Sequence, residues 1–123
     1  MISVLRKAKR IAMRNGMKYH LSAIVWRKRK PITVRTNRRK GQPKYLRLLD
    51  SGMWTTSHHA ECNAIRFAKP GDVIEVLRWG KSGNPLESTP CDMCQRAMRD
   101  AGIKCAIYTD SEGNQRTMPI CRS

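Results

Sequence analysis

Acidic residues are scarce in this chain, and nearly all of them lie in its second half. The 123 residues include 9 Asp and Glu against 25 Lys and Arg, a formal net charge of +16. Residues 1–50 hold 16 basic residues and one acid, Asp50, a balance of +15, while residues 51–123 hold 9 basic and 8 acidic residues, a balance of +1. Charge runs are usually solvated faces, but a surplus this one-sided favours an anionic partner, a nucleotide or a single-stranded nucleic acid.

Long apolar runs and a disulfide framework are also missing. No stretch approaches the length of a membrane-spanning helix, and four basic residues between positions 6 and 10 interrupt the segment that a secretory signal would keep apolar. Five cysteines is an odd number, which favours a reducing compartment, and Cys62, Cys105 and Cys121 are expected to be ordinary buried or partly buried thiols. We therefore expect a cytoplasmic protein with a single domain over residues 1–123.

Hydrophobic periodicity predicts an α/β protein with a mixed five-stranded sheet that begins with a β-hairpin. The expected elements are, in order, a helix over 2–15, strands over 21–26 and 32–36, a helix over 57–69, a strand over 73–79, a helix over 90–101, a strand over 104–108 and a final strand over 116–120. The long connection over 37–56 has no clear periodicity. This order predicts helices on both faces of the sheet, with a last strand that can pair back antiparallel.

Two short clusters carry the groups of a hydrolytic metal site. His59-Ala60-Glu61 supplies an imidazole and a carboxylate, and the segment from Pro90 to Cys94 supplies two thiols at Cys-x-x-Cys spacing. Structural zinc sites close with four Cys or His ligands, whereas catalytic sites keep three and leave a position for water. We therefore predict that His59, Cys91 and Cys94 hold one zinc ion per chain and that Glu61 transfers protons.

Each cluster coincides with a predicted helix start. Thr89 has the pattern of an N-cap, with Pro90 at the first helical position and Asp92 as the fourth residue of a capping box. Cys91 and Cys94 would then lie one turn apart on one helix face. The run that begins at Ser57 has the pattern of the other helix start. Helix N-termini favour anions, which suits thiolate ligands.

Neighbouring residues offer alternatives for some of these roles. His58 competes with His59 as a ligand, but it falls outside the His-x-Glu frame and is expected to be exposed or to support the ligands from behind. Cys62 as a fourth ligand would close the site and remove the water. Glu61 could instead be a first-turn acid that stabilises its helix, although its position two residues after the ligand histidine favours proton transfer.

The same residues carry a resemblance to a known family. H-A-E followed by P-C-x-x-C, with 28 residues between Glu61 and Pro90, resembles the zinc-dependent cytidine/deoxycytidylate deaminase superfamily, which includes tRNA adenosine deaminases and editing cytosine deaminases. The run His59–Ile65 is similar to the H-A-E-x-N-A-I of deoxycytidylate deaminases, and Ala101-Gly102-Ile103-Lys104 is similar to the (S/A)-G-I-K before their next strand. The similarity covers roughly residues 20 to 110.

The resemblance implies a three-layer α/β/α cytidine-deaminase-like fold and hydrolytic deamination of cytosine to uracil in a deoxycytidylate- or cytidine-type substrate. In this chemistry zinc activates water, Glu61 moves the protons, and ammonia leaves. The resemblance also places Asn37 at the sugar and backbone groups of Ala60, Ser88 and Thr89 at the base edge. Family members often form dimers or larger assemblies, so a homo-oligomer is expected by analogy.

Several residues outside the two clusters are candidates for contacts with a substrate or a partner. Arg38, Arg39 and Lys40 are candidate phosphate or nucleic-acid contacts, and Trp54 is a candidate for stacking on a base. The basic surplus supports an alternative, a polynucleotide deaminase acting on cytosine in single-stranded DNA or RNA or on adenosine in tRNA. A third class is a non-catalytic zinc-stapled nucleic-acid-binding module, which the retained Glu61 disfavours.

The final strand bears on the same choice. In the superfamily, enzymes similar to free-cytidine deaminases turn back antiparallel after the fourth strand, whereas deoxycytidylate, tRNA and editing types insert a helix and run parallel. The segment between Asp110 and Arg116 is too short for a helix. Chain length and the H-A-E-x-N-A-I motif therefore point to different branches of the superfamily.

Overall fold

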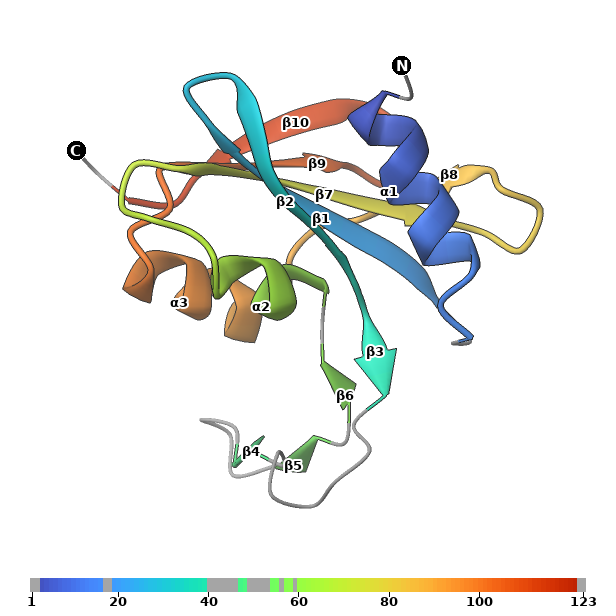
Figure 1. The fold of residues 1–123 in the computed structure, drawn as a ribbon, viewed down its shortest axis with the longest axis horizontal. Coiled ribbons are helices and arrows are strands. Elements are labelled where there is room, and N and C mark those ends of the chain that lie inside the picture. The colour runs from blue at the N-terminus through green and yellow to red at the C-terminus, as the bar shows by residue number, and fades with distance from the viewer. Residues whose placement is uncertain are drawn as a thin grey trace.

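The fold was analysed in a computed structural model that describes residues 3–16, 19–39, 47–48, 54–55, 57–58 and 60–121; for 38–39, 47–48, 54–55, 57–58 and 61–63 it describes the backbone alone. The elements in chain order are α1 (Val4–Met13), β1 (His20–Arg27), β2 (Lys30–Thr36), β3 (Arg38–Arg39), β4 (Arg47–Leu48), β5 (Trp54–Thr55), β6 (Ser57–His58), α2 (Ala60–Ile65), β7 (Val73–Trp79), β8 (Pro85–Leu86), α3 (Asp92–Asp100), β9 (Cys105–Thr109) and β10 (Gln115–Pro119) (Figure 1).

A mixed sheet with the strand order β10-β9-β7-β1-β2 forms the centre of the fold, and the short strand β8 pairs with β7. β7 and β9 run parallel and are connected through β8 and α3, while the other pairings in this sheet are antiparallel. The five predicted strands are all present. The sheet has β8 as a sixth strand, which the sequence did not predict. The sequence left open whether the last strand runs parallel or antiparallel, and β10 pairs antiparallel with β9.

β1 divides the core between the two faces of the sheet. Ala23 and Val25 are fully buried in one cluster with residues of α2 and α3. Ile24, which lies between them in the strand, is fully buried on the other face with Ala8 and Ala12 of α1. Because successive side chains of a strand point to opposite faces, α1 covers one face and α2 and α3 cover the other (Figure 1). The predicted helices on both faces are confirmed.

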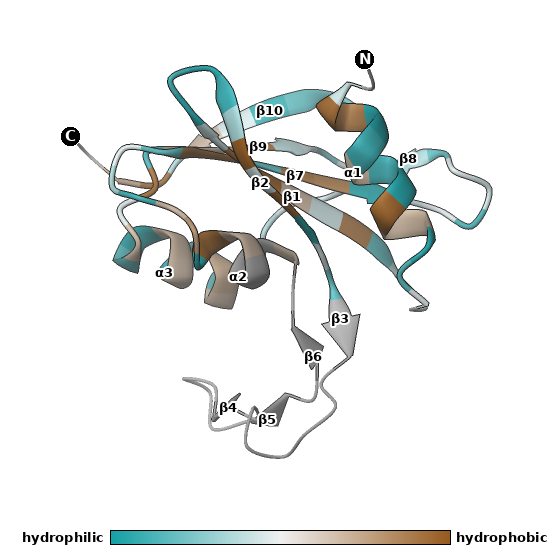
Figure 2. Ribbon diagram, viewed as in Figure 1, coloured by the Kyte–Doolittle hydropathy of each residue, from teal (hydrophilic) through white to brown (hydrophobic). Residues whose placement is uncertain are grey.

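α1 docks on the sheet through small residues. Ser3 caps the helix by accepting the N–H of Arg6 at 3.2 Å, and the Ser22 hydroxyl of β1 donates to the carbonyl of Ala8 at 2.6 Å. The helix is hydrophilic over much of its surface (Figure 2). α1 lies on the face of the sheet opposite to α2 and α3.

Gly102 closes the turn from α3 into β9. Its φ is +79°, its N–H donates to Arg99, and the N–H of Ile103 donates to Met98, which is the Schellman arrangement that ends a helix. A Cβ on Gly102 would lie 2.9 Å from the Cα of Pro70. The glycine of the A-G-I-K run therefore has a local physical reason in both conformation and space.

Helix boundaries near the predicted site differ from expectation. α2 covers Ala60–Ile65 rather than 57–69, because residues 57–58 form β6 and pair antiparallel with β3. At its other end, N–H bonds from Phe67 to Ala64 and from Ala68 to Ile65 tighten the last turn ahead of Pro70. No helix within the described residues is both long and apolar enough to cross a membrane.

Candidate metal centre

α3 begins two residues later than the sequence predicted. Cys91, with φ −74° and ψ 166°, is the N-cap, and its carbonyl accepts the N–H of Gln95 at 2.9 Å. Thr89, the predicted N-cap, donates its hydroxyl to Glu87 at 3.0 Å instead. The predicted capping box is therefore wrong. Cys91 and Cys94 nevertheless remain three residues apart across the first turn, where an N-cap side chain faces the third helical residue.

The two cysteines differ in exposure. Cys94 is fully buried in the cluster beneath α2 and α3, together with Met98, whereas Cys91 is exposed at the helix start and makes no capping hydrogen bond through its side chain. Cys105 and Cys121 are partly buried and form no disulfide within the described residues, as expected for ordinary thiols. The Cys-x-x-Cys pair therefore has one thiol in the protein interior, Cys94, and one at the surface, Cys91.

Ser88 lies where the parallel strands β7 and β9 separate. The strands pair from Val73 and Cys105 to Glu75 and Ile107. Beyond this point the Ser88 hydroxyl donates to the carbonyl of Val76 at 2.7 Å and accepts the N–H of Thr109 at 2.9 Å. The Ser88 N–H donates to the carbonyl of Thr109 at 2.9 Å. The segment that leads into α3 is therefore held at the carboxyl ends of two parallel strands, where open α/β sheets bind ligands.

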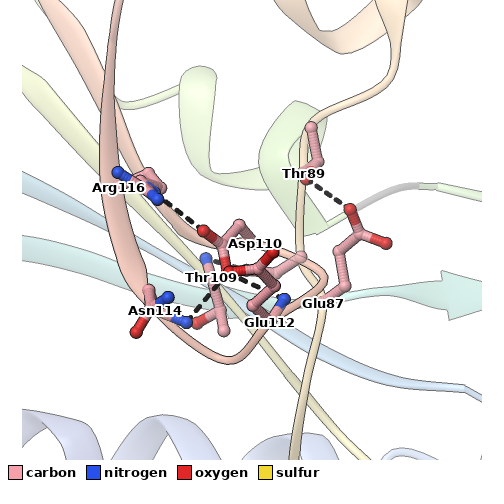
Figure 3. A network of polar contacts seen from close by, with 8 residues as sticks. Glu87, Thr89, Thr109, Asp110, Glu112, Asn114 and Arg116 are labelled. Carbon is pink, nitrogen blue, oxygen red and sulfur yellow. Dashed lines mark hydrogen bonds and ion pairs between the residues drawn. The ribbon is translucent and has the colours of Figure 1, made fainter.

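The turn between β9 and β10 lies beside this segment (Figure 3). The carboxylate of Asp110 accepts two backbone N–H groups of its own turn at 2.9 Å and the Nε–H of Arg116 at 2.7 Å. The hydrogen bond from Arg116 holds the pKa of Asp110 below its ordinary value. Since Thr109 precedes Asp110 and is bonded to Ser88, the turn that sends β10 back antiparallel is connected to the start of α3.

The other half of the predicted centre is described only in part. Ala60 begins α2 and is fully buried, while His59 lies outside the described residues. Glu61 is described by its backbone alone, in the first turn of α2. The assignments of His59 as a ligand and of Glu61 as the proton carrier stay predictions.

The structure brings the two motif-bearing helices to one place. α2 and α3 pack against each other on the same face of the sheet (Figure 1). Ala60, which follows His59 in the chain, and Cys94 belong to one buried cluster. Two motifs that are 28 residues apart in the sequence therefore flank a common core.

Within the described residues, no three His, Cys, Asp or Glu side chains form a group that could hold a metal ion. The predicted set includes His59, which is not among those residues. The chemistry of the partial set fits zinc, since Cys91 and Cys94 are thiols at the first turn of one helix with one of them at the surface.

Asn37 is buried and makes several hydrogen bonds within the fold. Its Oδ1 accepts the N–H of Leu21 at 3.0 Å and the Nδ2–H of Asn15 at 2.8 Å, and its Nδ2 donates to the carbonyl of Tyr19 at 3.0 Å. These bonds connect the end of β2 with β1 and with the segment between α1 and β1, a structural role that the sequence did not reveal because the three partners are distant from Asn37 in the chain. The predicted contact with a sugar stays a prediction.

The remaining predicted contacts involve β3, β5 and the segment that leads into α3. Arg38 and Arg39 form β3 and Trp54 begins β5, but their side chains lie outside the described part of the chain, as does Lys40 entirely. Ser88 is buried, its hydroxyl bonds β7 and β9, and its N–H donates to the carbonyl of Thr109, so its predicted backbone contact with a base stays a prediction. Thr89 is exposed.

Asp72 is a buried carboxylate between α2 and β7 that the sequence did not indicate as a candidate. Asp72 is 2% exposed and accepts two hydrogen bonds at 2.9 Å from Arg27 and one at 2.8 Å from the N–H of Lys69. The hydrogen bond from Arg27 is the main reason that the pKa of Asp72 lies below its ordinary value. This pair ties the end of β1 to the loop between α2 and β7. The only signal in the sequence was an acid beside the Pro70-Gly71 turn.

Comparison of the chain with protein-family models, with curated proteins and with solved structures gave no match.

Proposed function

We propose that this protein is a zinc-dependent hydrolytic deaminase with a cytidine-deaminase-like fold, converting cytosine to uracil in a deoxycytidylate- or cytidine-type substrate. The observation that carries the proposal is the convergence of the two motif-bearing helices. α2, preceded by His59, and α3, capped by Cys91, pack on one face of the sheet, with Ala60 and Cys94 in one buried cluster. Three candidate zinc ligands, one imidazole and two thiols, together with a carboxylate match the needs of nucleobase deamination.

In this proposal His59, Cys91 and Cys94 hold the metal. Bound zinc supplies Lewis acidity, which lowers the pKa of water to about 7. The Glu61 carboxylate would take a proton from the attacking water and deliver it to the ring nitrogen; it would then take the proton of the hydroxyl now bonded to the ring carbon, which becomes the carbonyl, and deliver it to the amine, which leaves as ammonia. Backbone groups of Ser88 and Thr89 orient the base, since this segment is held at the ends of β7 and β9 by the Ser88 hydroxyl.

The direction of β10 supports a free nucleoside as substrate, while the H-A-E-x-N-A-I motif supports a deoxycytidylate-type nucleotide. β10 returns antiparallel to β9 after a short turn, which is the topology of the enzymes similar to free-cytidine deaminases. The polynucleotide alternative is supported by the basic surplus of residues 1–50. In that alternative, Arg38, Arg39 and Lys40 contact phosphates and Trp54 stacks on a base.

One assay separates these possibilities. Zinc-loaded protein is incubated with dCMP, cytidine, single-stranded DNA and tRNA, and ammonia release and base change are measured for each. We expect turnover of dCMP or cytidine, and Glu61→Ala should retain zinc and fold but lose turnover by at least about a hundredfold, the usual contribution of positioned proton transfer. Glu112→Ala, in the exposed β9–β10 turn, is the matched control and should keep full activity. Absence of ammonia from all four substrates would overturn the proposal.

A further inference from the structure

α1 presents five basic side chains to solvent. Arg6, Lys7, Lys9 and Arg10 lie in the helix, Arg14 is its C-cap, and all five are exposed. Residues 3–16 contain no acid. Within the described residues the ion pairs are Arg27 with Asp72 and Arg116 with Asp110, neither of which involves α1. The helix therefore carries five positive charges that no carboxylate of the described fold neutralises.

These charges form an ordered row. Ala8 and Ala12 are fully buried and define the inner side of α1. Arg6, Arg10 and Arg14 follow one another at four-residue spacing on the outer side, a row of about 12 Å at 1.5 Å per residue. Lys9 flanks the row, and its Nζ lies 3.2 Å from the position that a Cβ on Gly83 would take. The bend that contains Lys81 is thus adjacent to α1 and extends the basic surface.

The placement of the charges is unfavourable for the isolated helix. Arg6 lies in the first turn, where the helix dipole favours acids, and that turn holds none. Arg6 with Arg10, and Arg10 with Arg14, are like-charge pairs at the spacing at which side chains meet, which destabilises a helix. Local helix stability does not account for this pattern, whereas an external polyanion would.

We propose that the outer face of α1, defined by Arg6, Lys7, Lys9, Arg10 and Arg14, binds the phosphate backbone of a single-stranded nucleic acid. This surface lies on the face of the sheet opposite to α2 and α3, so it anchors a polynucleotide away from the candidate metal centre. A single nucleotide would occupy one or two of the five cations, whereas a row of about 12 Å spans several consecutive phosphates of a polynucleotide.

The burial of the apolar side of α1 argues against a lipid surface as the partner. Basic amphipathic helices bind membranes by inserting their apolar face. Here Ala8 and Ala12 are fully buried against the sheet, and Leu5 is the one large apolar side chain of α1 among the exposed large hydrophobic residues of the described fold. Protein interfaces in turn are depleted of Lys and have an apolar centre, which this face lacks.

The test is binding of a fluorescent 20-nucleotide single strand at 50 to 200 mM salt. The variant carries Arg6→Gln, Arg10→Gln and Arg14→Gln, and the matched control carries Arg66→Gln, Arg99→Gln and Lys104→Gln, which are exposed residues on the α2 and α3 side with the same loss of charge. We expect the α1 variant to flatten the slope of log K against log salt by about 2 units and to bind on the order of 100-fold more weakly at 50 mM, since each lost contact removes about 0.7. The control should change less than threefold.

Equal weakening in both variants would overturn the proposal in favour of a diffuse charge effect. Vesicles with one quarter phosphatidylserine provide the other comparison, and binding to vesicles without binding to the oligonucleotide would overturn it in favour of a membrane. Circular dichroism melting confirms that each variant is folded, as Gln is a good helix former. Because binding is measured without turnover, its failure leaves the deaminase proposal intact, and failure of the deaminase assay leaves this surface intact.

Discussion

Replacing Ser88 with Ala tests how the segment leading into α3 is held. Ser88 is 4% exposed, and its hydroxyl joins the carbonyl of Val76 to the N–H of Thr109 at 2.7 and 2.9 Å. Alanine would leave both backbone groups without this partner between the separated strands. An unsatisfied buried group costs about 1–3 kcal/mol, and Thr109 is only half-buried, so we expect the free energy of unfolding to fall by about 2–3 kcal/mol in total.

Urea unfolding followed by tryptophan fluorescence measures this loss. With a urea dependence of about 2 kcal/mol per M for a chain of this size, the midpoint should move down by roughly 1–1.5 M. Ser82→Ala is the matched control, because Ser82 is exposed and its hydroxyl donates to Asn84 within the same bend, so its effect should stay below about 0.5 kcal/mol. A Ser88→Ala variant as stable as the control would refute the bridging role.

The same variant separates the side chain of Ser88 from its backbone. If only backbone groups contact the base, the folded variant should keep KM for dCMP within about threefold of the parent protein, because uniform binding is retained. A tenfold rise in KM with little loss of stability would instead make the hydroxyl a substrate contact.

Three further predictions concern the ligands and two buried polar groups. Cys91→Ala and Cys94→Ala should each lose zinc and stability, since metal binding energy is also folding energy, and elemental analysis that finds no zinc in folded parent protein would contradict the metal assignment. The depressed pKa of Asp72 means that its ion pair stabilises the fold above the unfolded-state pKa near 3.9 and that this stability is lost as pH falls through the lower folded-state pKa. Unfolding at about pH 6 and pH 2.5 should therefore show a larger acid loss for the parent than for Asp72→Asn, and equal losses would exclude this linkage. Asn37→Ala should lower stability by about 2 kcal/mol because two backbone groups lose their partner, and unchanged stability with a raised KM would assign Asn37 to substrate alone.

Local patterns were enough to predict most elements of the sheet. β7 was predicted at its observed bounds, because the strand-like run Val73–Trp79 lies between the Pro70-Gly71 turn and the bend that begins at Gly80. The hairpin of β1 and β2 was predicted from two strand-like runs around a basic turn, and Lys28 and Arg29 form that turn with positive φ. α1 followed from apolar residues at helical spacing.

Boundaries that depend on distant partners were predicted less well. Residues 57–58 form a strand instead of a helix turn because they pair with residues 38–39, and no local signal encodes that pairing. Thr is a residue type typical of an N-cap, yet the Thr89 hydroxyl donates to Glu87. The N–H of Ser88 donates to the carbonyl of Thr109 in β9. Cap residues are interchangeable in a local pattern, so tertiary hydrogen bonds decide which one starts the helix.

The sequence by itself determined the chemical inventory of this protein: a His-x-Glu and a Cys-x-x-Cys cluster, and a basic surplus confined to residues 1–50. Only the tertiary structure decided where these groups lie relative to one another. Periodicity in α1 tells which side of the helix is buried, but β1 is buried on both faces, so the strand offers apolar residues to either side. Packing placed α1 on one face of the sheet and α2 with α3 on the other (Figure 1). The sheet therefore lies between the basic helix and the candidate metal centre.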